Sequence, residues 1–113
     1  MYMPRDWSSF VRKKLQKGLE ITFTKEDLDW LTRRNGCSIQ DMEDELRSPD
    51  NMVFVERQEV EFRGRAEVRF RCYFVYSGNK GRCFIIIFDD GVKVLTAFPL
   101  GRTTLRRYRR KFK

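Results

Sequence analysis

The spacing of apolar residues changes along the chain, and this change constrains the fold more than any other feature. In the first fifty residues apolar side chains recur three and four positions apart, which is typical of amphipathic helices. From Met52 onward they alternate with polar side chains, as in strands with one buried face. The breaker residues 48–51 separate the two regions. A length of 113 residues suits one domain, 1–113. We therefore predict an α+β fold with helices on one face of an antiparallel meander of about four strands.

The first region predicts three helices. A stripe of apolar residues indicates a helix over residues 6–19, followed by a short extended segment, 20–23. Thr24 is a suitable N-cap for a second helix over residues 25–34, with acidic residues in its first turn and arginines in its last. Ser38 is the expected N-cap of a third helix.

The second region predicts four strands and a final helix. The strands are expected over residues 52–62, 66–76, 82–88 and 92–98, joined by three turns that each contain glycine. Residues 82–88 are apolar on both faces, which predicts the central strand. Alternation in the second strand places Arg69, Arg71 and Tyr73 on the exposed sheet face. A short basic helix over residues 105–112, capped by Thr103 or Thr104, ends the chain.

Positive charge is concentrated in the second region. Residues 51–113 contain 15 basic and 6 acidic residues, and the thirteen residues from Gly101 onward contain seven lysines and arginines and no acid. Such a field favours a polyanion, and we expect RNA. A solvated tail that only aids solubility is the alternative. Cations mixed with aromatics suit phosphate contacts and base stacking, so the candidate RNA-binding residues are Arg69, Tyr73, Arg102, Arg106, Arg107, Tyr108, Arg109, Arg110 and Lys111.

Several chemistries are excluded by composition. The chain has no histidine, so Ser-His-Asp and Cys-His catalysis and histidine-ligated metals are ruled out. The three cysteines form no CxxC pair, and we expect reduced thiols, no metal and no cofactor. No secretory signal and no apolar run of membrane-spanning length is visible, so we expect no membrane association and a cytoplasmic location.

Residues 21–24, 33–34, 37–46 and 48–50, followed by 81–88 and 92–99, resemble in order and spacing the BrnT-like small toxin domains. These domains are similar to RelE toxins and to barnase-like and EndoU-like ribonucleases. The resemblance covers about residues 20–100, with the basic tail 101–113 outside it. It implies a metal-independent endoribonuclease that cleaves messenger RNA and is neutralised by an acidic antitoxin protein.

The resemblance also implies positions for the site. Many relatives carry Thr-x-His where this chain has Thr24-Lys25-Glu26, so Glu26 occupies the histidine position. The matching basic positions are Arg34 and Arg82, and the hydroxyl position is Thr96. A catalytically silent RNA-binding or protein-interaction module on the same fold is the alternative. The oligomeric state is left open.

Arginines can stabilise the charge that develops on a phosphate during RNA cleavage, and Arg71 and Arg82 are the strongest candidates. We expect antiparallel pairing to bring both to one phosphate. Ordinary cross-strand ion pairing with Glu56, Glu59 or Glu61 is the alternative for both arginines. Glu26, Tyr73 and Tyr108 are the groups available as a base.

Overall fold

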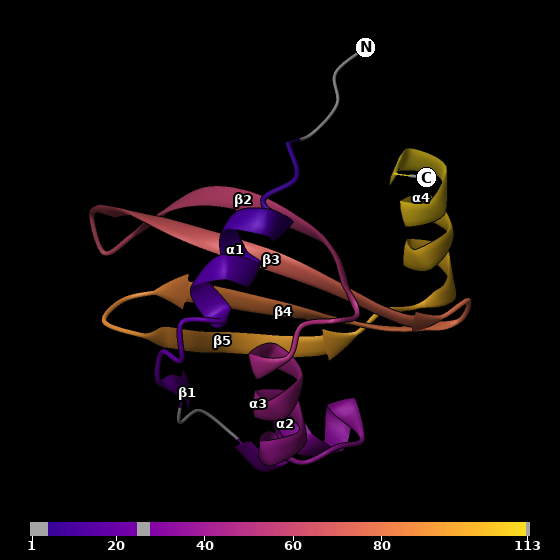
Figure 1. Ribbon diagram of the computed structural model, residues 1–113, viewed down its shortest axis with the longest axis horizontal. Helices are drawn as coiled ribbons and strands as arrows, with labels where there is room; N and C mark the ends of the chain where they lie inside the picture. Colours follow the sequence, from indigo (N-terminus) through magenta and orange to yellow (C-terminus); the bar gives the residue numbers. More distant parts are fainter. Residues whose placement is uncertain (1–4, 25–27, 113) are drawn as a thin grey trace.

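The computed structural model describes the backbone of residues 5–24 and 28–112, and the side chains of these residues as far as 107 (Figure 1). The fold is α+β, as predicted, with four helices and one five-stranded sheet in this part of the chain. The elements are α1 (Ser8–Leu15), β1 (Ile21–Phe23), α2 (Leu28–Asn35), α3 (Ile39–Arg47), β2 (Met52–Phe62), β3 (Arg65–Ser77), β4 (Lys80–Phe88), β5 (Val92–Pro99) and α4 (Arg102–Phe112).

The sheet has the strand order β1-β5-β4-β3-β2. Strands β2 to β5 form the predicted antiparallel meander, and β4 lies in the middle of the sheet. The fifth strand was not expected: residues Ile21–Phe23 pair in parallel with residues 92–94 of β5. The sheet is therefore mixed. The segment 20–23, which the sequence predicted to be extended, contains β1, and β1 forms the edge of the sheet beside β5.

The helices differ from expectation mainly at their ends. Helix α1 begins after Asp6, because the Asp6 carboxylate accepts hydrogen bonds from the amides of Ser8 (2.9 Å) and Val55 (3.1 Å) and holds the chain outside the helix. It ends at Leu15, before a turn in which Gly18 has a φ of 75°. The Ser38 cap of α3 is confirmed: its hydroxyl accepts from the Asp41 amide at 3.0 Å, and the Asp41 carboxylate accepts from the Ser38 amide at 3.1 Å.

Two further helix boundaries bear on the site. The Thr24 hydroxyl donates to the Leu95 carbonyl at 3.2 Å, and residues 25–27, on which the expected cap depends, lie outside the described residues. Helix α4 begins at Arg102 rather than at residue 105, so Thr103 and Thr104 lie within its first turn and do not cap it. The Leu105 amide donates to the Gly101 carbonyl at 3.1 Å, which starts the helix directly after β5.

The two faces of the sheet are covered unequally. Figure 1 shows α1 crossing one face, which we call the helix face, while α2 and α3 lie toward the β5 edge. The main core lies on this face and includes Leu15, Met42, Leu46, Phe74, Phe84 and Ile86. On the opposite face, α4 covers only one end, where Leu105 packs with Cys83 and Leu100. We call this second face the open face; it carries Glu56, Gln58, Arg69, Arg71, Tyr73, Cys83, Ile85, Ile87, Thr96 and Phe98.

Candidate nucleic-acid interface

The strand register arranges the open face in rows that run across the sheet. Arg71 of β3 is the partner of Ile85 of β4, and Ile85 is in turn the partner of Thr96 of β5. Neighbouring strands lie about 4.8 Å apart, so the backbones of Arg71 and Thr96 are about 10 Å apart, with Ile85 between them. Two of the predicted site residues therefore share one row of the open face.

The adjacent row lies closer to α4. It contains Phe54, Tyr73, Cys83 and Phe98, which are partners across β2, β3, β4 and β5. Tyr73 and Phe98 are half-buried, because they pack against the cluster around Leu105 of α4. Helix α4 thus forms a wall at one end of the open face, and the row of Arg71 and Thr96 lies one row farther from this wall than Tyr73 and Phe98 do.

Arg71 is the most unusual cation on this face. It is half-buried, and its Nε atom is buried without a hydrogen-bond partner among the described residues. Glu56 is its neighbour across the strand pair, yet within the described part of the chain no carboxylate comes within 4.0 Å of the Arg71 guanidinium. The cross-strand ion pair expected as the alternative role of Arg71 is therefore not formed. The charge of Arg71 is therefore not neutralised within the described chain and is available to an anionic ligand.

The groups beside Arg71 are held in their neutral forms. Burial raises the pKa of the Cys83 thiol to about 11, although Arg71 nearby favours the thiolate. Burial also raises the pKa of the Tyr73 hydroxyl, with the same opposing effect of Arg71. Near neutral pH, Tyr73 is therefore a hydrogen-bond donor, and its raised pKa argues against a role as a base.

Arg34 lies at the border of the open face. Its guanidinium carbon is 4.8 Å from the centroid of the Trp30 ring and 5.4 Å from the centroid of the Phe98 ring. Trp30 comes from the same helix four residues earlier, whereas Phe98 belongs to β5. Arg34 therefore joins the end of α2 to the row that contains Tyr73.

Arg82 does not join this group. It is the partner of Phe74, a core residue of the helix face, so its side chain lies on the side of the sheet opposite Arg71. Its guanidinium donates to Glu45 Oε2 at 2.8 Å, to Asn35 Oδ1 at 3.1 Å and to the Asn35 carbonyl at 3.2 Å. The expectation that one phosphate contacts both Arg71 and Arg82 is wrong, because the two side chains are on opposite faces. Arg82 does form an ion pair, but with Glu45 of α3 and not with a strand residue.

The network around Arg82 was not foreseen from the sequence. The Tyr76 hydroxyl donates to Glu45 Oε1 and accepts from Arg82 at 3.2 Å. Burial raises the pKa of the Glu45 carboxyl, which Tyr76 and Arg82 partly offset. Hydrogen bonding to Glu45 adds to burial in raising the pKa of Tyr76. The arrangement links β4 to α2 and α3, and we assign it a structural role.

The remaining predicted residues fall into three groups. Arg69 is on the open face, but its Nε lies 2.7 Å from the Glu67 carboxylate, which neutralises it. Arg102, Arg106 and Arg107 are exposed on α4, whose first turn has no acidic residue. Outside the described residues lie Glu26 and the side chains of Tyr108, Arg109, Arg110 and Lys111.

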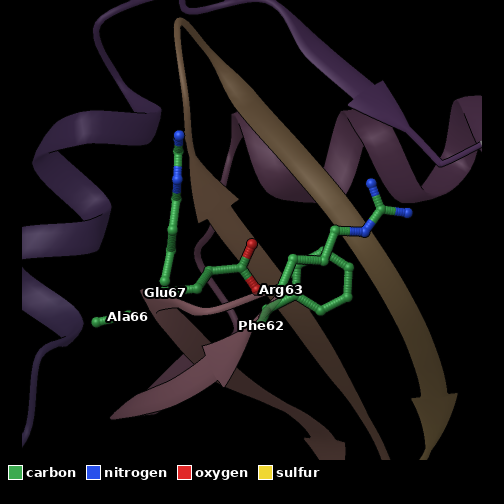
Figure 2. Close-up of a pocket in the computed structure, with 5 residues that line it drawn as sticks. Phe62, Arg63, Ala66 and Glu67 are labelled. Atoms are coloured by element: carbon green, nitrogen blue, oxygen red, sulfur yellow. The ribbon is translucent and has the colours of Figure 1, made fainter.

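A shallow pocket of about 450 Å³ lies at the β2–β3 hairpin and is lined by Phe62, Arg63, Arg65, Ala66 and Glu67. Figure 2 shows Phe62 and Arg63 on its rim together with Glu67. The Arg63 guanidinium lies 5.2 Å from the Phe62 ring centroid, and Glu67 is already paired with Arg69. The single carboxylate of the pocket is thus already paired with an arginine outside its lining, and the pocket holds none of the candidate catalytic residues.

No family model, curated protein or solved structure matches this chain. Within residues 5–24 and 28–112, no helix is long and apolar enough to cross a membrane, and no group of three or more Cys, Asp or Glu could hold a metal ion.

Sequence reasoning missed Trp30 and Phe98. Trp30 and Arg34 are four residues apart, which is the signal that could have placed them together on a helix surface. Phe98 has no such local signal, because its contact with Arg34 depends on where α2 lies against β5.

Proposed function

We propose that this chain binds RNA through the open face, with α4 as a positively charged wall beside it. Arg71 carries the proposal: its guanidinium is half-buried on the exposed side of the sheet, without a carboxylate at ion-pair distance in the described chain. A phosphate group at the exposed part of the guanidinium would supply the missing counter-charge. Arg34 and the exposed arginines of α4 extend the cationic surface on one side of Arg71.

The geometry favours nucleic acid over a small anion. The cations are spread over a sheet face, the end of α2 and a helix, and Tyr73 and Phe98 lie among them. Phosphates repeat along a strand and alternate with bases that stack on aromatic rings, so a polynucleotide matches such a surface. An RNA partner also agrees with the cytoplasmic location expected from the sequence.

The test is the affinity for a single-stranded RNA oligonucleotide, measured by fluorescence anisotropy over a range of salt concentrations. The logarithm of the binding constant should fall linearly with the logarithm of salt, by about 0.7 per phosphate neutralised. The Arg71→Met variant keeps the aliphatic stem and removes the charge. It should lower affinity roughly tenfold or more, the scale of a charged hydrogen bond.

Arg57→Met is the matched control. Arg57 is also a strand arginine, but as the partner of Phe70 it lies on the helix face, where it pairs with Glu59 at 3.8 Å. The two variants change net charge equally. Equal losses of affinity would show that only overall charge matters, and the open face would then not be the binding surface.

Cleavage of the bound RNA is the second candidate, and the resemblance to toxin ribonucleases motivates it. Arg71 and Thr96 in one row favour this reading, since a guanidinium and a hydroxyl can both contact a phosphate. Incubating a messenger RNA fragment with the protein in the absence of metal tests it. Cleavage that disappears in Arg71→Met would support an enzyme. Intact RNA under conditions of full binding would support the catalytically silent module.

An acidic antitoxin protein would be expected to compete for the same cationic surface. Adding a candidate partner to the anisotropy assay tests this expectation, because a partner bound to the open face should displace the RNA. A partner that binds without displacing RNA would show that its surface lies elsewhere.

A further inference from the structure

Helix α2 and strand β5 together carry a stack of three side chains. The Arg34 guanidinium lies against both the Trp30 and the Phe98 rings, at 4.8 and 5.4 Å from their centroids. Trp30 nevertheless remains 45% exposed, whereas Phe98 is half-buried. The stack therefore presents a large aromatic surface to solvent at the border of the open face.

This stack rests on a rigid support. Leu31, next to Trp30, is buried in the main core and fixes one side of α2. The Asn35 side-chain amide donates to the Leu31 carbonyl at 2.9 Å and to the Ala97 carbonyl of β5 at 3.0 Å. Because Asn35 and Ala97 immediately follow Arg34 and precede Phe98, the helix and the strand are held in register where the stack forms. The platform is thus preformed rather than placed on a loop.

A cation resting on surface rings is often no more than local packing. Two observations point further here. Among the described residues no carboxylate lies within 4.0 Å of Arg34, so its charge can still be used by a ligand. Phe98 also lies in the row next to that of Arg71, so the stack and the candidate phosphate contact belong to one continuous surface.

We infer that Trp30 is a stacking platform for an unpaired base, and that the RNA bound by this protein is single-stranded. In this arrangement a base lies on the exposed Trp30 surface, Arg34 contacts a neighbouring phosphate, and Arg71 contacts a phosphate farther along the strand. A duplex cannot bind in this way, because its bases are already stacked inside the helix. The inference rests on the proposed RNA binding and specifies which form of RNA is bound.

Tryptophan fluorescence gives a direct test, because the chain has two tryptophans and only Trp30 shares Arg34 with Phe98 of the open face. Trp7 packs against the main core on the helix face. In the Trp7→Phe variant only Trp30 emits, and in Trp30→Phe only Trp7 emits. Titration with single-stranded oligouridylate should quench Trp30 in the first protein and leave Trp7 unchanged in the second. An RNA duplex of equal length should leave both unchanged.

Affinity measurements separate stacking from charge. Trp30→Ala should lower affinity for oligouridylate roughly tenfold, the usual scale for one stacked base, without changing the salt slope. Arg34→Ala should lower both affinity and slope, the slope by about 0.7. Arg33→Ala is its matched control, since Arg33 is the preceding residue of the same helix and bonds only to the Asp29 carbonyl among described partners. Arg33→Ala should change neither the RNA affinity nor the salt slope appreciably.

The experiments distinguish a failure of the Trp30 platform from a failure of the proposed RNA binding. If RNA binds with the expected salt dependence but Trp30 is not quenched, or if a duplex quenches it equally, the platform is refuted and RNA binding stands. If no salt-dependent binding occurs with any RNA, the proposed function fails and the inference fails with it. Circular dichroism of Trp30→Ala verifies that the fold is retained.

Discussion

Replacing Arg82 by methionine is expected to destabilise the protein without weakening RNA binding by the folded chain. The Arg82 side chain connects β4 to α2 through Asn35 and to α3 through Glu45, and Tyr76 completes the network. The side chains of Arg82 and Glu45 are only 13% and 17% exposed. Methionine fills much of the same volume, so the main loss is that of the charge and its hydrogen bonds.

The magnitude follows from the burial of the pair. Removing one partner of a buried ion pair costs about 3–5 kcal/mol, because the other charge remains without compensation. The partial exposure of this pair places the expected cost near the lower end, about 3 kcal/mol. Replacing both Arg82 and Glu45 by methionine should cost less than the sum of the single changes, since no unpaired charge remains.

The loss of unfolding free energy caused by Arg82→Met should also depend on pH. Burial already raises the pKa of Glu45, and Arg82 counteracts that effect, so the variant raises this pKa further. The folded variant then holds the Glu45 proton more tightly than the unfolded chain does. A raised carboxyl pKa contributes stability that is present at low pH and is lost as pH rises through the folded pKa. The deficit relative to the wild type should therefore be smaller near pH 4 than near pH 7.

Urea denaturation at the two pH values measures these effects. The matched control is Arg47→Met, since Arg47 pairs with Glu43 on the same helix at 3.3 Å but is much more exposed. Arg47→Met should lower the free energy of unfolding by no more than about 0.5 kcal/mol. Equal costs at Arg82 and Arg47 would refute the structural assignment. A folded Arg82→Met protein that lost RNA affinity as strongly as Arg71→Met would show that Arg82 contacts the RNA after all.

Two further predictions concern α4 and the thiols. Leu105 is 2% exposed and joins α4 to Cys83, so Leu105→Ala should cost about 2 kcal/mol in urea denaturation. The same variant should also lower RNA affinity. Unchanged affinity would show that RNA binding does not require α4 to be packed against the sheet. In native protein at pH 8, a maleimide should label the partly exposed Cys37 first, because burial raises the pKa values of Cys72 and Cys83 and shields both thiols. Rapid labelling of all three thiols without denaturant would contradict this burial.

The sequence predicted the meander closely, because alternation and turn residues are local signals. The bounds of β2 match the prediction, and the Ser38 cap is confirmed in full. The pairing of β1 with β5 could not be predicted, since three residues are too few to show a period and their partners lie far along the chain.

The site was predictable only in part, for a similar reason. Alternation within β3 correctly placed Arg71 on the open face, because the two faces of that strand differ in polarity. The residues that follow Arg82 in β4 are apolar on both faces, so no pattern indicates on which side Arg82 lies. The convergence of Arg34, Trp30 and Phe98 depends on the position of α2 at the sheet edge, which is a tertiary property.

The parallel pairing of β1 with β5 has a consequence for the order of folding. Residues 52–99 form three successive hairpins whose contacts are local, and such contacts close early. The first fifty residues, in contrast, have no sheet on which to pack until that meander exists, and β1 has no partner until Val92–Val94 are in place. During synthesis the N-terminal half should therefore remain unfolded until the C-terminal half has left the ribosome. We expect mutations in α1 and β1 to accelerate unfolding, whereas mutations in β3 and β4 should slow folding.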